Sequence, residues 1–296
     1  MRFESTAADQ AARATSIAII RMKVIEAFRR HGLEVRRIDA TTLGADSGVR
    51  FPLENLLAEC HEMGRPLWDE VIDVHTRYMV EATRETDPSE LSDEEFLAKV
   101  RERVVAPSLL AALDEYAYSR PLIDGIADAP RRALGLSYPG RTLLLADRHL
   151  ADRDLDTAWL RGRNNTAAVP FDRYEEMVKD DIRIEVRRGD SIFLASKVAD
   201  MPRLIADHLG EAPNGVLFAI PHSREIDYYR PREAEATVRA AELLAGLAHM
   251  LGRDSPAPVS PRVFFWKDGE FSQVADGYDI APTGPFAQTL AELVGW

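Results

Sequence analysis

The spacing of apolar residues changes part-way along the chain, and this change limits the folds open to it. Over residues 1–118 apolar side chains recur mainly at helical spacing, as at Val24 and Phe28. After Pro121, β-rich runs appear between turn signals. We therefore predict an α+β fold. A mainly helical part over 1–118 packs on an antiparallel or mixed sheet with interleaved helices over 119–296, or the two merge into one compact unit.

Local signals place individual elements. Helices are predicted over residues 6–31, 52–64, 155–167, 198–209, 233–251 and 286–294. Ser92, followed three residues later by Glu95, predicts a capping box that opens one further helix. Hairpins are predicted at Gly189-Asp190, at His222-Ser223 and, most strongly, at Asp268-Gly269.

Composition and charge exclude several classes of protein. The formal charge of −12 disfavours nucleic acid and acidic membranes as partners. The single cysteine, Cys60, excludes an intramolecular disulfide framework and a cysteine-rich zinc site. The N-terminal segment is no signal peptide, and no apolar run approaches the roughly 18 residues of a membrane-spanning helix. These features predict a cytoplasmic protein, whose oligomeric state stays open.

One loop is rich in potential metal ligands. Within the run ADRHLADRDLD, Asp147, His149 and Asp152 offer carboxylate and imidazole groups for a divalent ion. Interleaved arginines and the lack of a glycine argue against a calcium loop, and Asp152 or Asp154 can simply cap the following helix. We favour a solvated, helix-capping loop and no bound cofactor, with a divalent metal as the alternative.

The predicted hairpin at PHSREIDYY holds the first-choice catalytic candidates. Strand alternation places Glu225 and Asp227 on one face, with His222 at the turn, so that acid–base or metal chemistry is open to them. Arg224 beside them is a candidate binding residue. The competing interpretation, which we favour, is the solvated face of an edge strand.

The segment RGRNN is a second candidate binding site. Arg161, Arg163 and Asn164 lie near the end of a predicted helix and are candidates for binding an anion. Arginines at a helix C-terminus also stabilise the helix dipole without any ligand. Both interpretations stay open.

The runs SIFLASKVADMPRLI and VLFAIPHSREIDYYRP resemble the paired signature of the YtpQ-like family of uncharacterised bacterial proteins. The matching positions are Ala195, Ser196, Pro221, Arg224 and Glu225, with Asn164 or Asn165 at the end of the preceding helix. This chain departs from the family at Phe193-Leu194, where the family favours Asp-Gly, and at Glu225, where it favours Asp. The resemblance implies an α+β fold and a bacterial origin, and it implies no reaction.

Familiar catalytic motifs are missing from the sequence. It contains no GxxxxGK phosphate loop, no GxGxxG after a strand, no GxSxG elbow and no HExxH pair. The leading hypothesis is therefore a non-enzymatic binding protein of the immunity, chaperone or adaptor type, with an acidic surface that suits a basic or mixed protein partner. The alternatives are a metal-dependent hydrolase that combines the 147–156 loop with the 222–227 hairpin, and a small-ligand sensor.

Overall fold

The computed structural model describes residues 7–111, 115–138, 141–253, 255, 257–277 and 279–295. The chain divides into two compact units, of which the first comprises residues 1–87 with 138–141 and the second comprises 88–137 with 142–296. The boundary lies after Asp87 and not after residue 118, because a strand within 88–118 pairs with a strand of the second unit. Helices and antiparallel sheets mixed along the chain confirm the predicted α+β fold.

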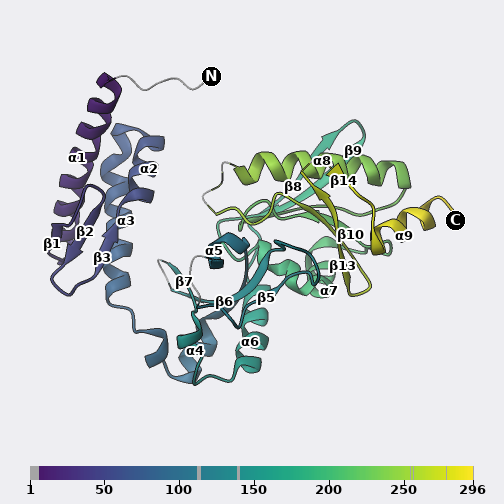
Figure 1. Ribbon diagram of the computed structural model, residues 1–296, viewed down its shortest axis with the longest axis horizontal. Coiled ribbons are helices and arrows are strands. Elements are labelled where there is room, and N and C mark those ends of the chain that lie inside the picture. Colours follow the sequence, from purple (N-terminus) through teal and green to yellow (C-terminus); the bar gives the residue numbers. More distant parts are fainter. Residues whose placement is uncertain are drawn as a thin grey trace. The chain divides into compact units, whose positions relative to one another are not determined.

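The first unit combines helices with a small antiparallel sheet of order β1-β2-β3 (Figure 1). Its elements are α1 (Ala7–Arg30), β1 (Val35–Arg37), β2 (Thr42–Ala45), β3 (Arg50–Pro52), α2 (Glu54–Met63), η1 (Arg65–Leu67) and α3 (Trp68–Thr83). Its core joins helix to sheet, since the ring centroids of Phe28 and Phe51 lie 4.7 Å apart. The indole N–H of Trp68 donates to the carbonyl of Cys60 at 2.7 Å, which fixes α3 against the end of α2.

The second unit contains a seven-stranded antiparallel sheet of order β14-β13-β12-β10-β11-β9-β8 and a smaller sheet. The first of its elements are η2 (Pro88–Glu90), α4 (Asp93–Lys99), β4 (Val100–Val105), α5 (Pro107–Ala111), β5 (Arg120–Pro121), β6 (Arg131–Ser137), β7 (Thr142–Leu144), η3 (Asp147–His149) and α6 (Leu155–Ala167). The strands of the large sheet are β8 (Arg173–Lys179), β9 (Ile182–Arg188), β10 (Val216–Ala219), β11 (Glu225–Tyr229), β12 (Val263–Lys267), β13 (Glu270–Asp276) and β14 (Asp279–Ile280). The remaining helical elements are η4 (Ala195–Asp200), α7 (Met201–Leu204), η5 (Ile205–Leu209), α8 (Ala234–Arg253) and α9 (Gly284–Leu293).

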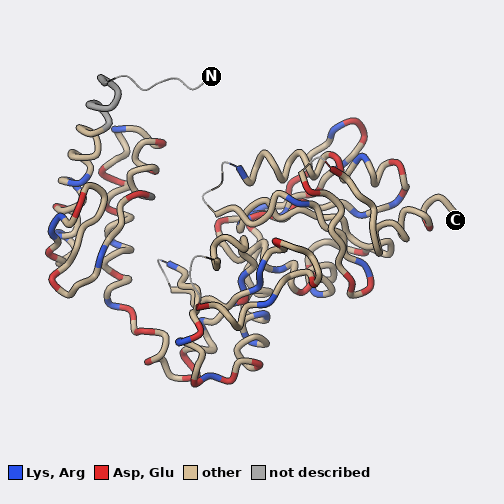
Figure 2. Tube along the Cα trace, in the orientation of Figure 1, with Lys and Arg blue, Asp and Glu red and all other residues tan. Residues whose placement is uncertain are grey.

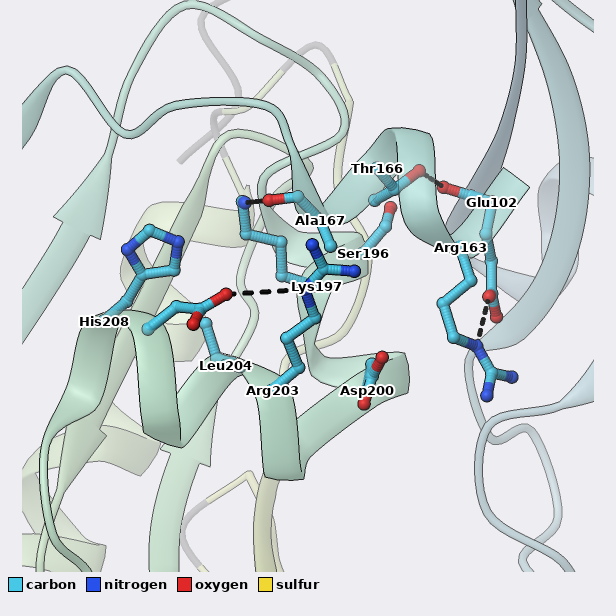
Figure 3. Close-up of a pocket in the computed structure, with 11 residues that line it drawn as sticks. Glu102, Arg163, Thr166, Ala167, Ser196, Lys197, Asp200, Arg203, Leu204 and His208 are labelled. Carbon is cyan, nitrogen blue, oxygen red and sulfur yellow. Dashed lines mark hydrogen bonds and ion pairs between the residues drawn. The ribbon is translucent and has the colours of Figure 1, made fainter. Parts of the chain in front are cut away.

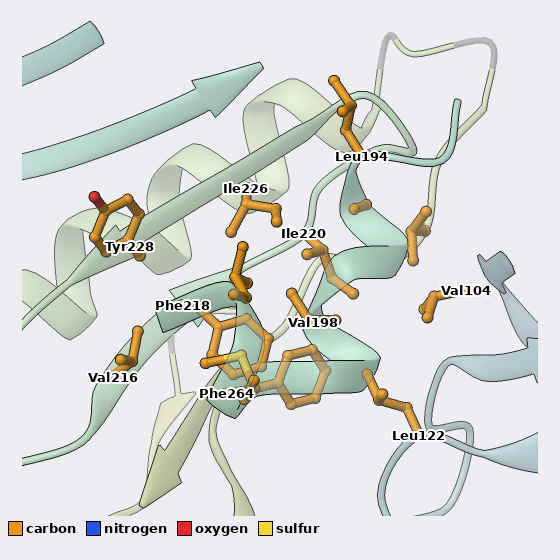
Figure 4. Close-up of a cluster of buried hydrophobic side chains, with 14 of the residues drawn as sticks. Val104, Leu122, Leu194, Val198, Val216, Phe218, Ile220, Ile226, Tyr228 and Phe264 are labelled. Carbon is orange, nitrogen blue, oxygen red and sulfur yellow. The ribbon is translucent and has the colours of Figure 1, made fainter. Parts of the chain in front are cut away.

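Each face of the large sheet has its own buried apolar core. On one face α8 and α9 pack on the strands, and the small side chains of α8 allow close approach: Ala240, Ala241, Ala245 and Ala248. On the other face the short helical elements from 195 to 209 supply Val198, Met201 and Leu204 (Figure 4). Both faces of the central strands are therefore removed from water.

Two of the three predicted hairpins are confirmed, and one is wrong. Asp268 and Gly269 have positive φ values of 51° and 91°, as a tight turn between β12 and β13 requires. The strands β10 and β11 flank His222 and Ser223 as predicted. The segment after Gly189 forms no strand and instead continues into η4, because a short apolar run suits a buried helical turn as well as a strand.

A buried serine links the smaller sheet to the helical element η4. It has the order β4-β6-β5, with β7 paired to β6, and α6 packs on β4. The Ser196 hydroxyl in η4 accepts the backbone N–H of Val104 at 2.8 Å. The predicted capping box is confirmed, since Ser92 and Glu95 exchange hydrogen bonds at the start of α4.

Charged residues of both signs are interspersed along the two units (Figure 2). Within the described ranges, no helix combines the length and the apolar character needed to cross a bilayer.

Candidate functional site

The loop over residues 147–156 is held by structural hydrogen bonds. The Asp147 carboxylate accepts the backbone N–H groups of Ala117 and Tyr118 at 3.0 and 3.2 Å. The His149 Nδ1 accepts the backbone N–H of Ala146 at 3.0 Å. Asp154 caps α6 by accepting the backbone N–H of Thr157, which confirms the capping interpretation of this loop.

No metal centre forms from the predicted ligands. In the part of the chain that the structure describes, no three His, Cys, Asp or Glu side chains gather in an arrangement that could hold a metal ion. The candidates Asp147, His149 and Asp152 therefore form no such group, either alone or with the 222–227 hairpin. Asp147 and His149 instead accept hydrogen bonds from backbone N–H groups, and Asp152 is exposed.

Two of the three candidate anion-binding residues of α6 have structural partners. The Arg163 guanidinium donates to Glu102 at 3.1 Å, and Glu102 also accepts from Arg132 at 2.5 Å. Glu102 is buried, so these two arginines neutralise its charge. The Asn164 side-chain oxygen accepts from Arg203 at 3.1 Å, while Arg161 is exposed. Arg163 and Asn164 therefore connect α6 to β4 and α7, respectively.

The candidate catalytic residues of the hairpin lie in the interior. β11 runs between β10 and β9, so it is a central strand and not an edge strand. Glu225 and Asp227 share the face that α8 covers, and their exposed fractions are 4% and 0%. The predicted alternation is thus confirmed, whereas the solvated-face interpretation is wrong, because it depends on strand order and that order is set by distant parts of the chain.

Burial changes the protonation of this carboxyl pair. Desolvation raises the pKa of the Asp227 carboxyl well above its usual range, and the charge of Glu225 and a hydrogen bond with it raise the pKa further. As a carboxylate, Asp227 would leave both of its buried oxygens without a donor. When protonated, Asp227 can donate a hydrogen bond to Glu225.

His222 and Arg188, both partly exposed, adjoin this buried carboxyl pair. His222 Nδ1 accepts the backbone N–H of Arg224 at 3.3 Å, and its Nε2 lies 3.8 Å from a carboxylate oxygen of Glu225. Burial lowers the pKa of His222, so the ring is neutral near pH 7. Arg188 lies 3.8 Å from the same Glu225 oxygen and binds Glu175 at 2.7 Å. Both ring nitrogens of His222 therefore face protein groups.

A pocket with a water-accessible volume of about 510 Å³ opens beside the hairpin. His222, Ser223 and Arg224 line it, together with Met250 and other residues near the end of α8. Glu225 and Asp227 do not line it. A molecule in this pocket would contact the exposed Arg224 and apolar side chains such as Met250 and Leu251. It would not contact Glu225 or Asp227.

The outer strand β8 is a feature that the sequence analysis missed. Six of its seven residues are exposed, and Tyr174, Met177 and Val178 have exposed fractions of 57%, 40% and 62%. Asp180 and Asp181, both with positive φ, form the turn to β9. This two-residue turn between alternating runs is the sequence signal that could have revealed β8.

An apolar groove runs between β8 and α8. Its water-accessible volume is about 310 Å³, and its lining residues are Met177, Lys179, Ile184, Glu242, Leu243, Gly246, Leu247 and Met250. Met250 also lines the pocket beside His222, so the two hollows adjoin. Four of the seven residues of β8 are charged, as is common for an exposed edge strand, and of its exposed apolar side chains Met177 lines the groove.

No family model, curated protein or solved structure matches this chain. The resemblance to the YtpQ-like family therefore stays a prediction.

Proposed function

We propose that this chain is a cytoplasmic binding protein that accepts an extended segment of a basic protein partner as an eighth strand along β8. The observation that carries the proposal is an exposed, seven-residue edge strand that borders an apolar groove. Immunity, chaperone and adaptor proteins are the classes that such an activity suits.

Main-chain hydrogen bonds would supply the affinity. One edge of β8 pairs with β9 along its whole length, and no other described strand pairs with its opposite edge. Half of its N–H and C=O groups therefore point outward, where an extended chain can bond them. Such addition needs no rearrangement of the sheet.

The groove would supply the specificity. Alternate residues of an added strand would face α8, as Met177 and Lys179 do, and would cover the exposed side chain of Met250. Aliphatic residues at every second position suit this wall. The groove lining carries Glu242 and Lys179, and Glu175 on the same face of β8 is paired with Arg188 at 2.7 Å. The preference for lysine and arginine in the partner therefore rests on the net charge of −12 of the whole chain.

The test is selection of random dodecapeptides displayed on phage against the purified protein. The proposal predicts enriched peptides that alternate aliphatic with basic residues and that slow hydrogen exchange of the β8 amides when bound. The double variant Met177→Glu, Met250→Glu places charges in the groove, and we expect it to weaken the selected peptides at least tenfold, or about 1.4 kcal/mol.

The matched control is Leu160→Glu, because Leu160 is an exposed apolar residue of α6 outside the groove, with an exposed fraction of 65%. It should leave peptide affinity unchanged. Peptides that bind the double variant as tightly as the wild type would overturn the proposal. The proposal would also be overturned if the free wild-type protein were a dimer and the double variant a monomer, since the edge of β8 would then bind a second copy of this chain.

A further inference from the structure

The pocket beside the turn between β10 and β11 has a serine with an unpaired hydroxyl in its lining. Ser223 lines the pocket and is 2% exposed, and its Oγ is buried without a hydrogen-bond partner among the described residues. Most buried polar groups are hydrogen-bonded, so such a hydroxyl calls for an explanation. Because it makes no hydrogen bond in this rotamer, rotation about the Cα–Cβ bond towards a ligand breaks none.

The backbone of the turn is held in place by hydrogen bonds on both sides. The N–H of Ser223 donates to the carbonyl of Ala257 at 3.1 Å, and its carbonyl accepts the N–H of Ala195 at 3.1 Å. The carbonyl of Pro221 accepts the N–H of Val259 at 3.0 Å. The pocket is therefore formed before a ligand enters it, which lowers the entropic cost of binding.

Arg224 gives this pocket a positive charge. It is exposed, and no carboxylate is found among the described residues that line the pocket. Glu225, the next residue, lies close to Arg188 and His222 instead. The guanidinium of Arg224 therefore keeps its donors for a ligand anion.

The cavity around Lys197 differs in both size and charge. Its water-accessible volume is about 10 Å³, which is room for about one water molecule. Its arginines already have partners, since Arg163 pairs with Glu102 and Arg203 with Asp207 (Figure 3). The pocket beside the turn, at about 510 Å³, lies in the size range of small-ligand sites.

The rest of the pocket lining is mainly apolar. Met250 and Leu251 at the end of α8 contribute to it together with Ala257, and Met250 is 57% exposed. The hydroxyl of Ser255, which also lines the pocket, accepts the N–H of Ala257 at 3.2 Å. The amide groups of a peptide would lose water against this wall without gaining partners, whereas an alkyl chain gains from its burial.

We propose that this pocket binds the anion of a short aliphatic carboxylic acid. The guanidinium of Arg224 would donate two parallel hydrogen bonds to the carboxylate, and the hydroxyl of Ser223 would donate a third. The alkyl chain would then cover Met250. A carboxylate matches one arginine in charge and in geometry, whereas a phosphate dianion would keep an uncompensated charge.

The test is calorimetric titration of the intact protein with acetate, butanoate, hexanoate and octanoate. Full burial of a CH₂ group strengthens binding about fourfold, so in this partly open pocket we expect the Kd to fall about twofold to threefold per added carbon. Octyl phosphate and octylammonium should bind at least tenfold more weakly than octanoate. A Kd that does not depend on chain length, or tighter binding of either analogue, would overturn the proposal.

A peptide carboxyl terminus could present the same anion. Acetyl-glycyl-leucine carries it at the end of a peptide, and we expect it to bind at least tenfold more weakly than octanoate, because its amide groups find no partners on the apolar wall. Tighter binding of this dipeptide than of octanoate would overturn the assignment to a free acid.

Two variants test the polar contacts. Arg224→Gln should weaken octanoate binding at least tenfold, the loss of charge-assisted hydrogen bonds. Ser223→Ala should weaken it about threefold without lowering the Tm, since it removes a hydroxyl that has no partner in the free protein. Full affinity in both variants would contradict the proposed contacts.

The matched control is Arg253→Gln, because Arg253 is an exposed arginine at the end of α8 that does not line the pocket. It should leave octanoate binding unchanged, and a loss equal to that of Arg224→Gln would show general charge attraction and overturn the site. Met177→Glu alters the groove beside β8 but not this pocket, and it should also leave octanoate binding unchanged. Peptide binding at β8 and acid binding here can therefore fail separately.

Discussion

The carboxyl group of Asp227 lies on the face of β11 that α8 covers, with Ala219 and Val186 opposite it on the neighbouring strands. On the same face of β11, the carboxyl group of Asp227 interacts with that of Glu225. Because two carboxylates cannot donate to each other, a hydrogen bond between the two side chains requires a protonated carboxyl group, which the raised pKa of Asp227 favours. A group whose pKa is raised by folding stabilises the native state fully below its unfolded pKa, and that contribution is lost as pH rises through the folded pKa.

Replacing Asp227 by asparagine should therefore stabilise the protein in a pH-dependent way. The amide mimics the protonated acid, since it is neutral and its NH₂ group can donate to Glu225. We expect the Tm of Asp227→Asn to exceed that of the wild type by several degrees at pH 8, and the gain to shrink as pH falls towards 4. Thermal unfolding across this range checks it. Asp190→Asn, at an exposed position, is the control, and a gain that does not vary with pH would contradict the expectation.

At the scale of elements, the packing of α6 on β4 depends on a glycine. A Cβ atom at Gly162 would lie 3.0 Å from the backbone nitrogen of Glu102 and 3.2 Å from the carbonyl carbon of Arg101. These are backbone atoms of β4, which cannot move without disturbing its pairing with β6. The close approach of helix and strand therefore requires glycine at this position.

Alanine substitutions at two helical glycines should have opposite effects. Gly162→Ala should destabilise the protein by about 1–3 kcal/mol, because overpacking forces the helix away from the strand. Gly246→Ala in α8 should stabilise it by about 0.5–1 kcal/mol, because its Cβ meets nothing within 4 Å and alanine favours the helix. Denaturant unfolding of both variants measures the difference. Stabilisation by both substitutions would show that helix propensity, and not the contact, dominates at Gly162.

At the scale of the whole molecule, each compact unit has its own apolar core. Phe28 and Phe51 lie in the core of the first unit, and Phe218 and Phe264 lie in a core of the second. Separate cores allow separate cooperative transitions. The chain leaves the first unit after Asp87 and returns to it over residues 138–141, and within that unit Arg141 donates to Glu85 at 2.6 Å.

We expect two unfolding transitions that mutations shift one at a time. Phe28→Ala should remove about 3–5 kcal/mol from the first unit and lower only its transition. Phe264→Ala should do the same to the second. Calorimetry resolves the two transitions. A single transition that both variants lower equally would show that the units unfold together.

The sequence by itself determined those features that a few neighbouring residues decide. The capping box at Ser92, the turn at Asp268-Gly269 and the helix over 155–167 follow from local hydrogen bonds and backbone preferences, and the structure confirms all three. The shared face of Glu225 and Asp227 follows from the two-residue period of a strand.

Only the tertiary structure decided what surrounds these residues. Whether Glu225 is solvated or buried depends on β11 being central, and this order arises from pairing with β9 and β10. The same order leaves β8 outermost, beside the groove that α8 forms. Lys197 is buried because η4 packs between two sheets, although its own segment resembles a strand in sequence. Burial and edge position depend on contacts between residues far apart in the chain, and local sequence patterns do not encode those contacts.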